Sequence, residues 1–152
     1  MKGQIVFITD GSPSAETAGE TAIAFAIAMK LPIKAVFILE ESWRNLLGDE
    51  WMSAAATRSK FFHWLEDGLR NHWQVVLSEF SRLGQAHNVE VATDIRVGKT
   101  EQVIIELTEE AATALLVLPN PHATAPAAAA GLRFNVNRLT KKVKCPILLG
   151  AR

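Results

Sequence analysis

Three consecutive polar or small residues, Asp10, Gly11 and Ser12, are the first place in this sequence where ligand chemistry is expected. They follow an apolar run, residues 5–8, that has the pattern of a strand covered on both faces. Pro13 favours the first turn of a helix, where the Ser12 hydroxyl can accept a hydrogen bond from a free amide. Because open α/β sheets bind ligands at the carboxyl ends of their strands, we expect any small-molecule site to include these three residues.

The other reactive side chains do not have the spacing of a known catalytic or metal centre. Ser12 and Ser14 lie near Asp10, but their neighbours do not form a nucleophile elbow, and helix capping explains Ser12. The histidines lack the pairwise spacing of zinc ligands. We therefore predict no catalytic residue, no metal site and no enzymatic activity. The histidines are His63, His72, His87 and His122.

The only cysteine among the 152 residues is Cys145, so an intramolecular disulfide cannot form. It lies in an apolar run, residues 145–149, where a small buried side chain is expected. A reactive thiol needs exposed and electropositive surroundings. Although Lys144 is adjacent, we therefore predict a structural thiol at Cys145.

The apolar spacing predicts alternating strands and helices along the chain. Continuous apolar runs indicate strands buried on both faces, whereas the strict alternation of residues 89–97 indicates an edge strand with one wetter face. The pattern predicts one α/β domain over residues 1–152, a three-layer α/β/α sandwich around a parallel sheet. The expected strands are residues 5–8, 34–39, 89–97, 114–118 and 145–149, and the expected helices are residues 13–30, 57–85, 100–112 and 132–143.

The net charge is zero, but the charges are unevenly distributed along the chain. No acidic residue follows Glu110, whereas several basic residues do. Such asymmetry is typical of an anion-binding or nucleic-acid-binding surface, or of a contact between oppositely charged faces of two subunits. The basic residues after Glu110 are Arg133, Arg138, Lys141, Lys142, Lys144 and Arg152.

Two classes of partner are not expected. No apolar run approaches the ~18 residues of a membrane span, and the first residues lead into a strand rather than a signal peptide, so we predict a cytoplasmic protein without a membrane contact. No aromatic platform or recognised nucleic-acid-binding module accompanies the basic residues. Nucleic-acid binding through the basic end of the chain is therefore a minor alternative.

Four short segments stand out along the chain: T-D-G-S-P-S at residues 9–14, R-V-G-K at 96–99, L-L-V-L at 115–118 and K-C-P-I-L-L at 144–149. Together they resemble the universal stress protein family over almost the whole chain. None is specific alone, but their order and spacing match. The resemblance implies an adenine nucleotide alpha hydrolase-like fold with a five-stranded sheet of order 3-2-1-4-5. It also implies a homodimer that pairs its last strands, here Ile147 to Leu149, which would cover an apolar edge.

The glycines with which many members of that family bind ATP are missing from this chain. Such glycines let backbone amides approach phosphate oxygens. Alignment on the fourth strand puts Pro119 and His122 where two glycines are expected. Counting back from Cys145 puts Arg133 and Phe134 where a Gly-Ser pair is expected. Proline has no amide hydrogen to donate, so we predict no ATP cofactor, although the family's acidic residue, Asp10, is retained.

Two functions follow from the resemblance and from this departure. The leading interpretation is a dimeric stress-response or regulatory protein that does not bind ATP and acts through contacts with an unknown protein partner. The alternative is a nucleotide- or anion-binding protein with a divergent phosphate loop, in which Asp10, Gly11, Ser12 and Arg133 are the candidate ligand-binding residues. In that case the Arg133 guanidinium and the helix start after it would replace the glycine amides.

Overall fold

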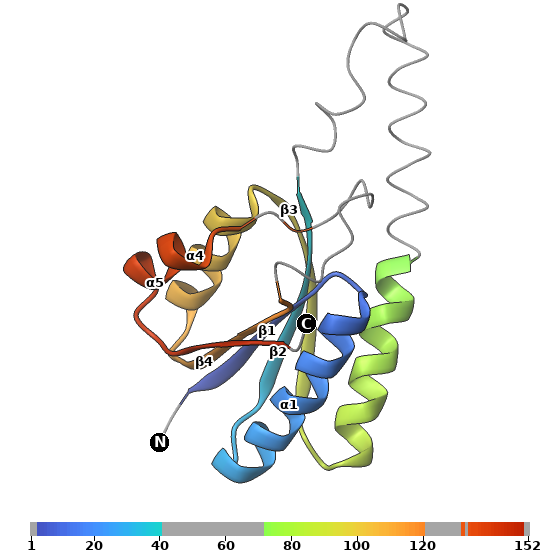
Figure 1. Cartoon of the computed structure of the whole chain (residues 1–152). Coiled ribbons are helices and arrows are strands. Elements are labelled where there is room, and N and C mark those ends of the chain that lie inside the picture. Colours follow the sequence, from blue (N-terminus) through green and yellow to red (C-terminus); the bar gives the residue numbers. More distant parts are fainter. Residues whose placement is uncertain (1–2, 41–71, 121–131, 133, 151–152) are drawn as a thin grey trace, which may run out of the picture.

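The computed structural model describes residues 3–40, 72–120, 132 and 134–150 (Figure 1). Strands and helices alternate along the described chain. The element before β3, residues 72–86, is the described part of a helix. In order, the others are β1 (Gln4–Thr9), α1 (Pro13–Met29), β2 (Ile33–Glu40), β3 (Val91–Gly98), α4 (Thr100–Glu110), β4 (Thr113–Leu118), α5 (Val136–Lys142) and β5 (Ile147–Leu149).

The strands form one sheet of order β3-β2-β1-β4-β5, and every neighbouring pair is parallel. Strand β1 lies at the centre, where Phe7 pairs with Ala35 of β2 and Val117 of β4. This position explains the uninterrupted apolar run of β1, because a central strand of a covered sheet has no wet face. The predicted strand order and the predicted central and edge strands are confirmed.

Helices cover both faces of the sheet, as the three-layer prediction required. Residues of β1 alternate between the two sides, so that Phe7 belongs to one hydrophobic cluster and Ile8 to the other. The first cluster lies under α1 and helix 72–86 and includes Trp73, whose side chain is 1% exposed. The second lies under α4 and α5 and includes Leu107 and Leu139.

Some predicted bounds are wrong by a few residues. Helix α5 begins at Val136 rather than at residue 132, because Asn135 is extended and caps the helix. Strand β3 begins at Val91 rather than at residue 89, because the Val89 amide donates to the carbonyl of Gly84 instead of joining the sheet. The predicted helix 57–85 is described only from residue 72, so its start lies outside the described residues, as does the segment 41–56.

None of the helices within the described ranges is long and apolar enough to cross a membrane.

Candidate functional site

The loop after β1 is held by hydrogen bonds within itself. One Asp10 carboxylate oxygen, Oδ1, accepts the amide of Ser12 at 2.9 Å, and Thr9 Oγ1 accepts the amide of Gly11 at 3.1 Å. Gly11 has a φ of 76°, a left-handed conformation that glycine adopts without steric cost. The predicted ligand residues Asp10, Gly11 and Ser12 are therefore together at the carboxyl end of the central strand, but the polar groups of this loop already bind one another.

The start of α1 is also occupied by a side chain of the protein. Ser12 Oγ accepts the amide of Ala15 at 3.2 Å, and Pro13 is the first helical residue, as the sequence predicted. A helix N-terminus attracts anions through its free amides. Because Ser12 satisfies one of them, an incoming phosphate would have to displace this cap.

The end of β4 meets the same loop from the neighbouring strand. Pro119 is buried and supplies no amide hydrogen. The next amide, that of Asn120, donates to Ser14 Oγ at 2.9 Å, and the Asn120 side-chain amide donates to the carbonyl of Gly150 at 3.2 Å. We call Asp10, Gly11, Ser12, Pro119 and Asn120 the strand-end site. Its backbone donors are turned toward the protein.

The second half of the predicted phosphate site is not assembled among the described residues. Arg133 and His122 lie outside them, and Phe134 packs against the second hydrophobic cluster. Helix α5 begins three residues after Arg133, and the amide of Arg138 in its first turn donates to the capping Asn135 Oδ1 at 3.0 Å. The predicted start of this helix at residue 132 is therefore wrong, because Asn135 is extended and caps a helix that begins at Val136.

A histidine that the sequence did not place in the site lies over the loop after β1. A Cβ atom added to Gly11 would lie 3.1 Å from His72 Nε2 and 3.1 Å from Val76 Cγ2. The His72 ring also contacts Phe37 edge-on, with ring centroids 6.2 Å apart. About sixty residues separate His72 from Gly11 in sequence, so only the packing of helix 72–86 on α1 and the sheet brings them together.

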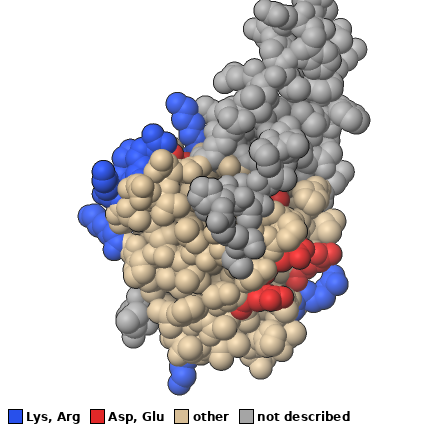
Figure 2. Space-filling view, in the orientation of Figure 1, with Lys and Arg blue, Asp and Glu red and all other residues tan. Residues whose placement is uncertain are grey.

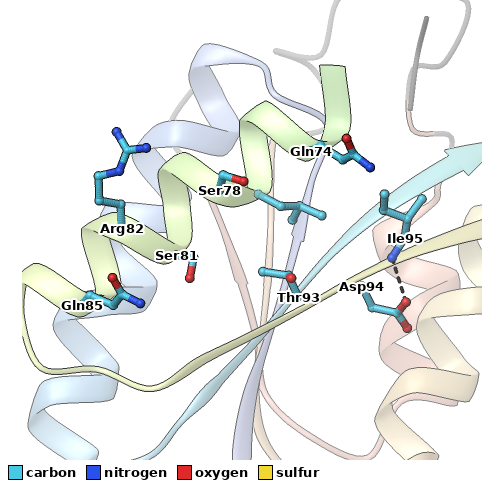
Figure 3. Close-up of a pocket in the computed structure, with 9 residues that line it drawn as sticks. Gln74, Ser78, Ser81, Arg82, Gln85, Thr93, Asp94 and Ile95 are labelled. Carbon is cyan, nitrogen blue, oxygen red and sulfur yellow. Dashed lines mark hydrogen bonds between the residues drawn. The ribbon is translucent and has the colours of Figure 1, made fainter. Parts of the chain in front are cut away.

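A hollow lies beside the edge strand, between helix 72–86 and β3 (Figure 3). Its volume is about 570 Å³ and its walls are mostly polar. We call it the β3 groove. The sequence did not predict it, because polar residues on a helix normally indicate a face exposed to solvent. Only in the folded chain does the row of polar helix residues lie beside a strand. It is lined by Gln74, Leu77, Ser78, Ser81, Arg82 and Gln85 from the helix and by Thr93, Asp94 and Ile95 from β3.

Asp94 and Arg96 form an ion-pair network that joins β3 to α4. Arg96 Nε donates to Asp94 Oδ2 at 2.7 Å, and the two terminal guanidinium nitrogens donate to the two carboxylate oxygens of Glu110 at 2.8 and 3.0 Å. Hydrogen bonding from Arg96 lowers the pKa of Glu110, and hydrogen bonding to Glu110 and Asp94 raises the pKa of Arg96. Lys34 of β2 lies 3.6 Å from the same Glu110 carboxylate.

Lys and Arg gather over the region of α5 and α4 on the face of the molecule that Figure 2 shows. On the same face, Asp and Glu lie over the region of α1 and helix 72–86, with some Lys and Arg beside them. The exposed basic residues of this region include Lys141, Lys142 and Lys144, whereas Arg138 is paired with Glu101 at 2.8 Å. The uneven charge distribution in the sequence therefore becomes an uneven surface.

The remaining reactive groups do not assemble into a centre. Among the described residues, no group of three or more His, Cys, Asp and Glu side chains is placed to hold a metal ion. Cys145 is partly buried against the second hydrophobic cluster, and this burial raises the pKa of its thiol. A raised pKa leaves less thiolate at neutral pH, which agrees with a structural cysteine.

The topology and the position of the strand-end site define a class of protein: a parallel α/β sandwich whose ligand position lies at the carboxyl ends of its central strands. The model of the universal stress protein family matches residues 1–149, so the chain belongs to this family. The resemblance drawn from the four sequence segments is confirmed.

Solved structures with this fold cover nearly the whole chain. The universal stress protein UspA from Lactobacillus plantarum has a TM-score of 0.76 at 14% identity, with 98% of this chain and 97% of that chain covered. A universal stress protein family protein from Arabidopsis thaliana with AMP bound has a TM-score of 0.63 at 14% identity, with 99% and 92% covered. One from Archaeoglobus fulgidus, in complex with dAMP, has a TM-score of 0.61 at 16% identity, with 99% and 98% covered.

At these identities the structural likeness shows the fold alone. No curated protein matches the sequence at a significant level.

Proposed function

We propose that this universal stress protein is a dimeric regulatory protein that acts through contacts with other proteins, without binding ATP and without catalysing a reaction. The observation that carries the proposal is the end of β4, where Pro119 supplies no amide hydrogen and the Asn120 amide donates to Ser14 Oγ at 2.9 Å. A phosphate group needs several free amides, and those of Gly11, Ser12 and Ala15 bind protein atoms instead.

The alternative is a nucleotide or an anion bound in a different way at the strand-end site. Similar structures favour this alternative, because three of those proteins were solved with AMP, dAMP or cAMP bound. Asp10, Gly11 and Ser12 stand at the ligand position of the fold, and Arg133 would supply the positive charge. This alternative requires the Ser12 cap or the Asn120 hydrogen bond to open.

Thermal unfolding of the nucleotide-stripped protein, with and without magnesium ATP, separates the two functions. AMP and inorganic phosphate serve as further ligands, and the Arabidopsis relative described with AMP serves as the positive control. A ligand at ~100 times its dissociation constant would stabilise the protein by about 2.7 kcal/mol, and each kcal/mol raises Tm by roughly 2–4 °C. We expect no rise at millimolar nucleotide.

A rise in Tm that is specific for nucleotide contradicts the proposal and supports the alternative. The variants Asp10→Asn and Arg133→Ala then test where the nucleotide binds. Loss of the rise in both variants, with Tm otherwise unchanged, places the ligand at the strand-end site.

A further inference from the structure

The outer edge of β3 presents a row of backbone groups that none of the other described strands covers. The Ile33 amide donates to the carbonyl of Glu90 at 2.9 Å, so the backbone of residue 90 faces β2. Successive residues of a strand alternate in direction, so residues 92, 94 and 96 face β2 as well. The amides and carbonyls of Val91, Thr93, Ile95 and Val97 therefore point away from the sheet.

The hollow beside this edge has polar walls that suit one extended chain. The β3 groove has the edge strand as one wall and helix 72–86 as the other (Figure 3). Ser78 and Ser81 of the helix and Thr93 of the strand offer hydroxyl groups to it, and Thr93 is exposed. Arg82 lines it as well, and none of the described carboxylates forms an ion pair with that guanidinium.

One of the outward amides, that of Ile95, already donates a hydrogen bond to a side chain of β3 itself. Asp94 Oδ1 accepts the amide of Ile95 at 2.8 Å, where the carbonyl of an added strand would otherwise bind. Arg96 holds the other oxygen of this carboxylate at 2.7 Å and is itself held by Glu110. The Asp94 carboxylate therefore protects the middle of the edge, as charged side chains on edge strands commonly do.

We propose that the β3 groove binds an extended, hydrophilic peptide segment of a partner protein, which adds as a strand to the β3 edge and carries an acidic side chain for Arg82. This inference rests on the proposed function, because it names the partner and the surface of a protein that acts through protein contacts. Strand addition uses backbone hydrogen bonds for affinity and alternate side chains for specificity. The hydroxyl and amide groups of the helix wall select polar side chains.

The geometry favours a peptide over a small molecule. Strand β3 has eight residues, Val91–Gly98, and at ~3.3 Å per residue its edge extends over about 26 Å. Backbone donors and acceptors that recur along such a length are matched by another backbone. A compact ligand would leave most of them unused.

The test is a selection of random ten-residue peptides displayed on phage against the immobilised full-length protein. Selected peptides are synthesised with a fluorescein label, and their affinities are measured by fluorescence anisotropy. We expect selected sequences to contain Ser, Thr, Asn or Gln and at least one acidic residue. In ¹⁵N-labelled protein, their addition should shift the amide resonances of residues 91–97.

Two substitutions at Thr93 test the backbone of the edge. Thr93→Pro removes the outward amide hydrogen and leaves the bonds to β2 intact, because the amide of residue 93 does not face β2. Thr93→Val removes the hydroxyl and keeps the amide. We expect affinity to fall about tenfold or more in Thr93→Pro and much less in Thr93→Val. Circular dichroism and Tm verify that both variants fold.

A second pair of variants does not depend on proline. Ser78→Trp fills the β3 groove, whereas Val75→Trp adds the same bulk at an exposed position of the helix that does not line it. Affinity should be lost in the first and kept in the second.

Asp94→Ala frees the Ile95 amide and should bind more tightly than wild type, whereas Asp94→Asn keeps an acceptor oxygen and should bind nearly as wild type does.

Three results would overturn this inference: no peptide is selected, selected peptides bind Thr93→Pro and Ser78→Trp as tightly as wild type, or β3 pairs with β3 of a second copy. Sedimentation analysis of Thr93→Pro detects the last case, as a loss of self-association. Peptides that bind outside the groove leave the proposed function standing. Nucleotide binding contradicts the proposed function without involving the groove.

Discussion

Gly150, directly after β5, lies where a larger residue does not fit. A Cβ atom at this position would lie 2.7 Å from the carbonyl oxygen of Ser14 and 3.0 Å from the Cβ of Ala18. The same glycine donates its amide to Leu118 at 2.8 Å and accepts a hydrogen bond from Asn120 at 3.2 Å. One residue therefore connects the last strand, the end of β4 and the first turn of α1.

The substitution Gly150→Ala is expected to destabilise the protein by about 1–3 kcal/mol, because the added methyl group meets backbone that cannot move freely. Urea unfolding at neutral pH measures the change. Lys144→Ala, at an exposed position of the same segment, is the control and should change the free energy of unfolding by less than about 0.5 kcal/mol. An unchanged stability of Gly150→Ala would show that this contact yields without cost.

Cys145 provides a second prediction at this scale, through the reactivity of its thiol. Burial raises its pKa, so the thiolate fraction at pH 8 should be smaller than in free cysteine. We expect iodoacetamide to label the folded protein more slowly than the urea-unfolded protein, as followed by mass spectrometry. Labelling that is faster in the folded state would contradict the assignment of a structural thiol.

Among the elements, β3 and α4 depend on each other through one guanidinium group. Arg96 on the strand binds both oxygens of Glu110, the last residue of the helix. Both partners are partly exposed, with side-chain exposures of 28% and 42%, so salt and water weaken the pair. Its clearest signature is a pH dependence, because hydrogen bonding from Arg96 lowers the pKa of Glu110.

We expect Glu110→Gln to be less stable than wild type near pH 7 and to approach it in acid. A carboxyl group with a lowered folded-state pKa stabilises the protein above its unfolded pKa, about 4.3 for glutamate. That contribution is lost as the pH falls through the lower folded-state pKa. Urea unfolding from pH 7 to about pH 3 measures the difference, with Glu109→Gln at the exposed neighbouring position as the control. A difference that does not change with pH would contradict this.

The elements show how much the sequence could predict. Continuous apolar runs identified β1, β2 and β4 to within one or two residues, because strands buried on both faces leave an unambiguous pattern. Helix α5 was predicted four residues too early, since Phe134 is apolar but belongs to the core ahead of the Asn135 cap.

The two candidate sites differ in how well they could be predicted from the sequence. Asp10, Gly11 and Ser12 are contiguous and follow a recognisable strand, so their place was predictable. The β3 groove lies between helix 72–86 and a strand that begins several residues later. Which residues line it depends on how the helix crosses the strand, and the sequence does not show this crossing. A Cβ atom at Gly84 would clash with the Val91 side chain. The only sign of this close approach between the helix and β3 in the sequence is a glycine, which by itself does not identify the neighbouring residue.

At the scale of the whole molecule, the sheet formed by the described strands has two edges, β3 and β5. In β5, Pro146 accepts the amide of Leu116 at 2.9 Å and Gly150 donates to Leu118 at 2.8 Å, so residues 146, 148 and 150 face β4. Ile147 and Leu149 then direct their backbone groups outward, and Leu149 is 37% exposed. This edge remains the predicted contact of the homodimer.

The substitution Leu149→Pro tests that contact, because it removes an outward amide hydrogen and leaves the bonds to β4 in place. We expect the dissociation constant of the dimer to rise about tenfold or more, and that of Leu149→Val to change much less. Analytical ultracentrifugation over a range of concentrations measures both. A monomeric wild-type protein, or a dimer that Leu149→Pro leaves intact, would contradict pairing through the last strand.

The strand order also sets the spacing of partner contacts in such a dimer. Two sheets joined at β5 would place ten strands side by side, and the segments added outside the two β3 edges would lie eleven strand spacings apart, about 53 Å at ~4.8 Å each. A fully extended linker covers at most ~3.6 Å per residue, so a partner needs roughly 15 residues or more between two binding segments to occupy both edges. A partner with such spacing would gain avidity of about 10²–10⁴ over a single segment. A partner whose binding segments are closer together could occupy only one edge at a time and would bind with the affinity of a single segment. The dimer would therefore select partners by the distance between their binding segments.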